Sequence, residues 1–217
     1  MTKLAHSYSA IKMFENCPKQ YYEVRITKKW RDRGGTASIF GDRVHKDLEA
    51  RLKKTAPLTP ETSKYEKLCA AFERIPGELK TEQEMTLNES LTPTGWWSGD
   101  AWLRSKLDVL VLNGATAIVA DWKTGKHRPD FSQLELFALQ TFKHYPEITT
   151  VRSTFVWLKD DLLDKQTYTR TDEPKLWDKL LTRIKRIEGA VETGVWPAKP
   201  SGLCGFCPVM NCEHRRH

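Results

Sequence analysis

Apolar residues recur at helical spacing in the first third of the chain, alternate like strands in the middle, and return to helical spacing toward the end. The helical pattern predicts helices over residues 7–24 (broken after Cys17 by Pro18), 38–54, 61–74, 131–145 and 173–191. The alternating pattern predicts strands over residues 82–87, 102–112, 151–158 and 166–170. Helices before and after a block of strands favour an α/β fold, with a mixed central β-sheet covered by helices on both faces.

The middle of the chain also predicts a tight hairpin, because two β-branched apolar runs flank Asn113-Gly114. With those two residues as the loop, Asp108 pairs with Val119, and Asp121 lies one diagonal step from Asp108. Lys123 shares that face, since side chains alternate along a strand. Charged groups in a buried hairpin are costly unless they are paired or hold a metal. A buried Asp–Lys pair and a magnesium site therefore both remain open.

Composition narrows the class of protein. Hydrophobic residues make up 39% and charged residues 29%, with no long apolar run, so we expect a soluble protein without a membrane span. The N-terminal residues carry no apolar signal segment, which predicts an intracellular, cytoplasmic location. A net charge of +7 favours a polyanionic partner. No P-loop of the form GxxxxGK[ST] occurs, so nothing indicates an ATP-driven motor.

The cysteines are unevenly distributed. Three lie together as Cys204-x2-Cys207-x4-Cys212, one is Cys17, and Cys69 stands apart as a small buried hydrophobe. In an intracellular chain such a cluster indicates metal or iron–sulfur ligation sooner than disulfides. Four thiolates suit both a tetrahedral zinc ion and a 4Fe-4S cluster, and the spacing does not separate the two.

A histidine motif lies on the second predicted helix. In Gly41-x3-His45-x3-Glu49 the last two side chains lie one turn apart on one side of the helix. Neutral imidazole binds divalent metals well, although a single histidine on a helix is more often structural. Its occurrence together with Asp108 and Asp121 favours a ligand.

The motifs of this chain resemble, in their order, those of RecB-type nucleases of the PD-(D/E)XK superfamily. They are Gly41-x3-His45-x3-Glu49, Asp108, Asp121-Trp122-Lys123-Thr124-Gly125-Lys126 and Gln133-Leu134-x2-Phe137. The stretch SYSAIKMFENCPKQYY is similar to the start of that family. With the four clustered cysteines added, the pattern resembles the iron–sulfur branch, which includes the AddB nuclease domain and the CRISPR-associated adaptation exonuclease. The resemblance runs from Ser7 to Cys212.

The resemblance implies a restriction-endonuclease-like α/β core and a cysteine-ligated tail. One nuclease domain would span residues 1–217. Its parts would be a helical region (1–77), a catalytic core (78–170) and a C-terminal helix with the cluster-binding tail (171–217).

The resemblance also implies roles for individual residues. Lys123 would be the catalytic lysine and Gln133 would stand near the DNA backbone. The ligands of Mg²⁺ or Mn²⁺ would be His45, Asp108, Asp121 and the Trp122 carbonyl. The ligands of a 4Fe-4S cluster, or of zinc as the alternative, would be Cys17, Cys204, Cys207 and Cys212.

Two positions depart from the family pattern. Ser105 replaces a glycine three residues before Asp108, and Phe137 replaces a tyrosine four residues after the glutamine. Neither change removes an implied metal ligand. Glu49 is expected to orient its neighbours, and Glu84 on the preceding strand is an additional ligand candidate.

The expected function is a metal-dependent DNA nuclease, an exonuclease preferring single-stranded DNA. The alternative is an inactive DNA-binding or assembly subunit on the same scaffold, which the two departures motivate. A helicase or a recombination or adaptation protein is the partner that the resemblance implies, in DNA repair or recombination. Trp96 and Trp97 could stack on unpaired bases, although core packing is the default for such residues. A basic loop, with Lys28, Lys29, Arg31 and Arg33, could follow phosphates.

Overall fold

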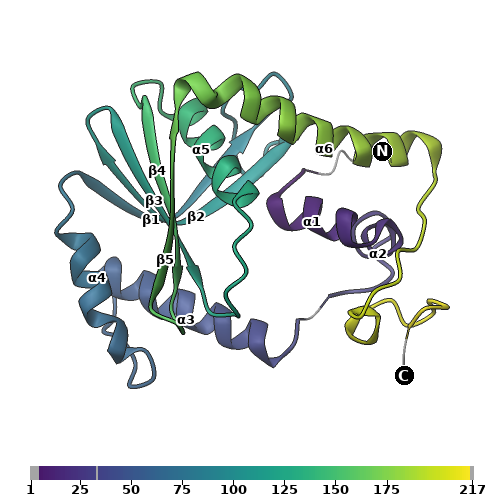
Figure 1. The fold of residues 1–217 in the computed structure, drawn as a ribbon, viewed down its shortest axis with the longest axis horizontal. Coiled ribbons are helices and arrows are strands. Elements are labelled where there is room, and N and C mark those ends of the chain that lie inside the picture. The colour runs from purple at the N-terminus through teal and green to yellow at the C-terminus, as the bar shows by residue number, and fades with distance from the viewer. Residues whose placement is uncertain (1–4, 33, 216–217) are drawn as a thin grey trace. The chain divides into compact units, whose positions relative to one another are not determined.

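The computed structural model describes residues 5–32 and 34–215, and its chain divides into two compact units (Figure 1). The sheet unit contains Thr36–Trp177, and the terminal unit contains His6–Gly35 and Asp178–His217 from the two ends of the chain. Arg33 of the basic loop lies outside the described residues. None of the helices in the described part of the chain combines the length and the apolarity that a membrane crossing requires.

A five-stranded mixed sheet forms the centre of the sheet unit, and its strands follow the order β1-β2-β3-β4-β5. They are β1 (Glu78–Leu87), β2 (Leu103–Asn113), β3 (Thr116–Lys123), β4 (Thr150–Trp157) and β5 (Leu162–Thr169). Neighbours are antiparallel except β3 and β4, which are parallel. A parallel pair needs a crossover connection, and α5 (Ser132–His144) supplies it. The predicted α/β fold with a mixed sheet is confirmed.

Helices cover both faces of this sheet. On one face α3 (Thr36–Leu52) and α4 (Glu66–Glu73) share a core with β2 and β3, and the predicted stripe of α3 is buried there. That core contains Val44, Leu48, Leu52, Cys69, Phe72, Val109, Val111, Ala120 and Trp122. The alternate strand residues Leu110 and Val119 are equally buried but lie outside that core, on the face that α5 covers.

The hairpin between β2 and β3 differs from the prediction in its register. Asn113 pairs with Thr116, so the turn is Gly114-Ala115. Gly114 has a φ of 55° and is the first central residue, which is where a type II′ turn places glycine. The expected pairing of Asp108 with Val119 is therefore wrong, because Val119 pairs with Leu110.

Most other predicted elements are confirmed with shifted boundaries. Strands β1 and β5 each begin four residues earlier than predicted. The helix predicted over 61–74 is shorter, because a 3-10 turn over Ser63–Tyr65 precedes α4.

The terminal unit contains the first helices of the chain and most of the last one. These are α1 (Tyr8–Asn16), α2 (Pro18–Tyr21), a π-helical turn (Tyr22–Ile26) and, from Asp178 onward, α6 (Glu173–Thr193). The Ser7 hydroxyl accepts a hydrogen bond from the Ala10 amide at 3.2 Å and so caps α1. The predicted break after Cys17 is confirmed.

Aromatic stacking attaches the tail of this unit to its first helices. The Trp196 ring stacks on Tyr21 and Tyr22, with centroids 6.0 and 5.2 Å away, and meets Phe14 edge to face at 6.2 Å. Further on, the Lys199 Nζ donates to the Glu15 carbonyl at 2.8 Å. The segment after α6 is therefore held although it has little regular structure.

Candidate active site and cysteine centre

The sheet is loosened at Asp108. Pairing between β1 and β2 continues on both sides of Glu82 and Asp108 but not between them, and Glu82 has a φ of 51°. A positive φ in a non-glycine residue of a strand is strained, and such strain concentrates at functional sites. Pairing between β2 and β3 stops at Val109 and Ala120, and the Trp122 amide instead donates to Asp108 Oδ2 at 2.7 Å. The carboxylate of Asp108 thus takes over the role of a backbone acceptor.

Three possible ligands meet at this point. His45 Nδ1 lies 3.2 Å from Asp108 Oδ1, and one ligand atom from each of His45, Glu82 and Asp108 lies within 4.8 Å of the others. They belong to a cavity of about 340 Å³, whose wall also includes Asp42, Glu49 and Lys106. Two carboxylates and one imidazole form a donor set that suits a divalent cation such as Mn²⁺ or Mg²⁺.

Lysines offset part of the negative charge in this cavity. Lys106 forms an ion pair with Glu82, and Lys53 Nζ lies 2.5 Å from Glu49 Oε1. Glu49 therefore lies on the cavity wall, paired with a lysine one turn further along α3. The Glu82 side chain is 14% exposed and the Lys106 side chain is 47% exposed, so the lysine that pairs with this carboxylate reaches solvent.

A second cluster lies at the end of β3 and the start of α5. The Lys123 Nζ is 2.6 Å from Asp121 Oδ2, an ion pair without the alignment of a hydrogen bond. Gln133 joins the two, because its Nε2 donates to Asp121 Oδ1 at 3.0 Å and its Oε1 accepts from Lys123 Nζ at 2.8 Å. The ammonium also lies 4.9 Å from the centre of the Phe155 ring. Its position is thus fixed from three directions.

The two clusters influence each other electrostatically. Burial raises the pKa of Asp121 above its ordinary value, Lys123 opposes this, and the charge of Asp108 adds to it. Burial alone would lower the pKa of His45, but its hydrogen bond to Asp108 and the charges of nearby carboxylates outweigh burial and raise it. The carboxylates of the two clusters therefore act on one another's ionisation, and a bound cation would favour their ionised forms.

Gly41, the first residue of the histidine motif, lies against the loop that follows β3. A Cβ atom at this position would come 2.9 Å from Thr124 Oγ1. Glycine therefore lets α3, which carries His45, approach the strand end that carries Lys123.

The structure brings the sequence-predicted residues together as two groups. His45 and Asp108 belong to the first group, Asp121, Lys123 and Gln133 to the second, and Trp122 connects them through its amide. Gln133 was expected near the DNA backbone, and its side chain lies on the Asp–Lys pair.

Glu82 was missed by the sequence analysis, which considered Glu84 on the same strand instead. Glu84 is exposed and pairs in register with Lys106, outside the ligand group. The available signal was the pairing of the predicted strands, which brings Glu82 opposite Asp108. The positive φ of Glu82 could not be predicted, because no residue pattern in the sequence indicates it.

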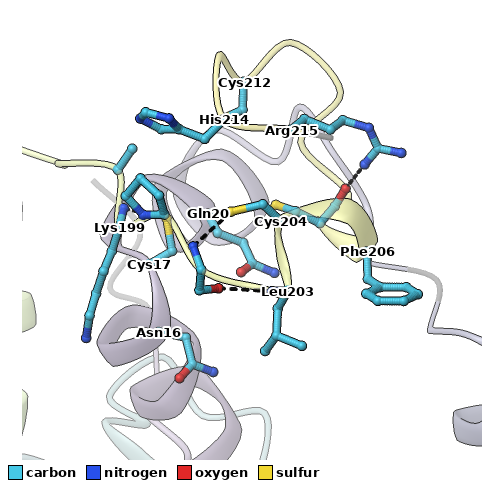
Figure 2. A pocket seen from close by; sticks show the side chains of 14 residues that line it. Asn16, Cys17, Gln20, Lys199, Leu203, Cys204, Phe206, Cys212, His214 and Arg215 are labelled. Carbon is cyan, nitrogen blue, oxygen red and sulfur yellow. Dashed lines mark hydrogen bonds between the residues drawn. The ribbon is translucent and has the colours of Figure 1, made fainter. Parts of the chain in front are cut away.

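The four clustered cysteines line one cavity of the terminal unit, of about 220 Å³ (Figure 2). The backbone amide of Lys199 points to Cys17 Sγ at 3.4 Å, and that of Ser201 to Cys204 Sγ at 3.2 Å. Burial raises the pKa of the Cys207 thiol, and the nearby Cys17, Cys212 and Cys204 sulfurs raise it further. Thiolates gathered in this way destabilise one another unless a metal centre offsets their charge.

The sulfur atoms are spread around that cavity. Among the residues that the structure describes, no three cysteines bring their sulfurs within 4.8 Å of one another. A tetrahedral zinc site, with bonds of about 2.3 Å, requires sulfur atoms roughly 3.8 Å apart. The fifth cysteine, Cys69, is fully buried in the sheet unit, and burial raises its pKa to about 11, so it is the small buried hydrophobe that was predicted.

Comparisons with known proteins agree with this architecture. A family model described as the PD-(D/E)XK nuclease superfamily matches residues 85–212, more than half of the chain. No curated protein is significantly similar to the chain. A solved structure from Eubacterium rectale, described as a "Putative exonuclease", is similar with a TM-score of 0.55 and 15% identity, over 98% of this chain and 90% of that one. The structure of SSO0001 is similar with a TM-score of 0.50 and 15% identity, over 98% and 88%. At this identity the two structures show the fold alone.

Proposed function

The chain belongs to the PD-(D/E)XK nuclease superfamily, and we propose that it is a divalent-metal-dependent deoxyribonuclease, an exonuclease that prefers single-stranded DNA. One observation carries this proposal. The His45–Glu82–Asp108 ligand group lies beside a buried Asp121–Lys123–Gln133 cluster, at the point where the pairing of β2 with β1 is interrupted and its pairing with β3 ends. The two units are proposed to be parts of one nuclease domain.

His45, Asp108 and Asp121 would hold the metal, with the Trp122 carbonyl and Glu82 as further ligands. The donor set fits, because oxygen ligands predominate and the cavity carries excess negative charge. A bound Mg²⁺ or Mn²⁺ would lower the pKa of a coordinated water and offset charge that develops on the phosphate.

Lys123 acts on the reacting groups directly. Its ammonium group is positioned by Gln133 and by the Asp121 carboxylate, so it can orient the attacking water and stabilise a phosphate oxygen. In the hydrolysis the water oxygen bonds to phosphorus, the bond to the leaving oxygen breaks, and the water proton ends on that oxygen or in solvent. Gln133 accepts from Lys123, which leaves the other ammonium protons for the substrate.

Three considerations support a single-stranded DNA substrate. The family acts on DNA, the net charge is +7, and the iron–sulfur branch of RecB-type nucleases that the motifs resemble includes exonucleases of single strands. Ser105 and Phe137, the two departures that motivate the inactive-subunit alternative, are both buried. The cleavage assay described below separates that alternative from an active nuclease.

We extend the proposal to a 4Fe-4S cluster held by Cys17, Cys204, Cys207 and Cys212. The shared cavity of the four cysteines and the amides directed at two of them suit either a cluster or zinc, and the resemblance to the iron–sulfur branch favours the cluster. Its role would be structural, since it joins the first helices to the tail. Absorption spectra and iron, sulfide and zinc analysis of anaerobically purified protein test this. Stoichiometric zinc without iron would contradict it.

Nuclease activity is tested with labelled single-stranded DNA and Mn²⁺, with EDTA as the control. Wild type should shorten the DNA only with the metal. Asp108→Ala and Lys123→Ala should be inactive yet folded, and Glu84→Ala, which removes an exposed carboxylate of β1, should remain active. Equal activity with EDTA, or full activity of Lys123→Ala, would refute the assignment.

A further inference from the structure

We infer that Trp96, Trp97 and Arg104 form a stacking platform for unpaired DNA bases, on the strand that leads to the active site. The inference rests on the proposed function, because it identifies where the substrate is held before cleavage. The platform comprises two indole rings on the loop between β1 and β2 and the guanidinium of the second residue of β2.

The loop that carries the tryptophans has a defined shape. Asp100 accepts hydrogen bonds from the Thr94 hydroxyl at 2.9 Å and the Ser98 hydroxyl at 2.5 Å, and these hydrogen bonds lower its pKa. The Thr94 amide also donates to the Thr86 carbonyl at 2.9 Å, which ties the loop to β1. Polar contacts therefore hold the loop, and the side chain of Trp97 is not needed to close it.

Trp97 is left in solvent by this loop. Its side chain is 86% exposed, and all other tryptophans of the chain are at least partly buried. The Arg104 guanidinium carbon lies 5.4 Å from the centre of the Trp96 ring and 5.6 Å from that of Trp97. One cation thus faces two rings and orients them. An aromatic ring left in solvent beside a cation offers a face on which another π-system can stack.

Arg104 also connects the platform to the active site. Alternate residues of a strand share a face, so Arg104, Lys106 and Asp108 follow one another along one side of β2. Lys106 and Asp108 line the same cavity, which supports this alternation. The strand from Arg104 to Asp108 is about 13 Å long, at 3.3 Å per residue. A stacked single strand of roughly four nucleotides covers the same distance, at ~3.4 Å per base.

The chemistry of this surface fits a single strand of DNA. Every unpaired base offers a π-face on which an indole ring can stack, whatever the sequence, whereas bases in a duplex are already stacked on one another. Arg104 supplies positive charge for a phosphate beside the platform, and Lys106, which pairs with Glu82, is half exposed between platform and cavity. An apolar protein segment would match the rings but not these two cations.

Binding without cleavage tests the platform. A labelled single-stranded oligonucleotide of about twelve nucleotides is titrated in EDTA, with a duplex of the same sequence beside it. Trp97→Ala should weaken single-strand binding roughly tenfold and duplex binding much less. Trp97→Phe should restore most of the affinity. Leu163→Ala, which removes an exposed apolar side chain from β5 at the other edge of the sheet, is the matched control.

The outcomes separate this inference from the proposed function. Single-strand affinity that is unchanged in Trp97→Ala, or an equal loss for duplex, would overturn the platform even if wild type cleaves DNA. Weakened single-strand binding would support the platform even if wild type shows no cleavage. In an active enzyme, Trp97→Ala should lower kcat/KM on the long oligonucleotide more than on a dinucleotide, and equal reductions would count against the platform.

Discussion

The two units of this protein hold their functional groups in different ways. In the sheet unit, charged side chains satisfy one another: Lys123 and Gln133 bind Asp121, and Lys106 binds Glu82, on strands fixed by an apolar core. In the terminal unit, stacking on Trp196 orders the tail, while four thiols surround a cavity. The candidate active site is thus arranged before any cation binds, whereas the proposed cysteine centre would depend on its cofactor. The following predictions test that contrast.

The largest effect is expected at the active site. Asp108→Ala and Lys123→Ala should each lower the cleavage rate by at least about 10²–10³-fold, because each removes a group that we propose to act on the reacting phosphate or its metal. Both variants should remain folded in EDTA with a lowered melting temperature, since Asp108 accepts the Trp122 amide and Lys123 pairs with buried Asp121. Loss of the folded state together with activity would show that the site is not preorganised.

At the cysteine centre the effect should fall on stability instead. Cys17→Ser and Cys204→Ser should cost the terminal unit about 3–5 kcal/mol, if the cluster acts like a cross-link between distant segments. Hydrogen exchange measures this, with faster exchange over residues 6–32 and unchanged exchange in β2 and β3. Cys69→Ala, which removes a thiol outside the cluster, should leave the absorption spectrum of the cluster unaltered. Fast exchange throughout the sheet would contradict the contrast.

Asp121 is expected to lower the stability of the folded protein and to be needed for cleavage. Because its pKa is raised, ionisation of this carboxyl disfavours the folded state, and the penalty is present above the ordinary pKa and disappears as pH falls. Asp121→Asn should therefore raise the melting temperature of metal-free protein near neutral pH, but not near pH 4, and should abolish cleavage. A lower melting temperature at neutral pH would mean that the ion pair with Lys123 outweighs burial.

A smaller change tests the spacing between α3 and the end of β3. Gly41→Ala places a Cβ 2.9 Å from Thr124 Oγ1, so the helix or the loop must shift. We expect a loss of activity of about tenfold, since small displacements of catalytic groups are costly. Thr124→Ala in the same chain should restore most of it, because it removes the clashing atom. Absence of this rescue would place the effect elsewhere.

The smallest effect concerns an ion pair of the terminal unit. Arg183 contacts both carboxylate oxygens of Glu15, at 2.6 and 2.9 Å. Burial alone would raise the pKa of Glu15, but Arg183 and Lys12 together outweigh burial and the pKa is lowered. The pair therefore stabilises the protein above the ordinary pKa and is lost as pH falls through the lowered value. Glu15→Gln should cost up to ~1 kcal/mol at pH 7 and less at pH 3, as chemical denaturation would measure.

The pattern of apolar residues predicted the sheet and its helices, because burial on both faces imposes it. The apolar stripe of α3 and the hairpin both followed from periodicity. The register of the hairpin could not be predicted in this way. Asn113-Gly114 predicts a type I′ turn with both residues in the loop, whereas Gly114 is the first central residue of the turn in the structure. Each register requires a different turn, and the two turns have nearly equal energies. Packing across the whole sheet therefore decides which register forms.

The sequence predicted most of the candidate site, as it predicted most of the fold. Motif order indicated His45, Asp108, Asp121 and Lys123, and the structure groups them. Glu82 required knowledge of which strands pair and of a strained backbone, neither of which a local pattern contains. The position of Gln133 on the Asp–Lys pair likewise depends on how the crossover helix begins.

The stacking of Trp196 has a consequence for how this protein matures. It brings the cysteines of the tail back to the helices that carry Cys17 by contacts that need no cofactor. Because the whole sheet unit lies between these ligands in the chain, the ribosome must finish that unit before the last thiol is available. Cofactor insertion would then occur only on chains translated through Cys212, so colour in purified protein would report intact synthesis.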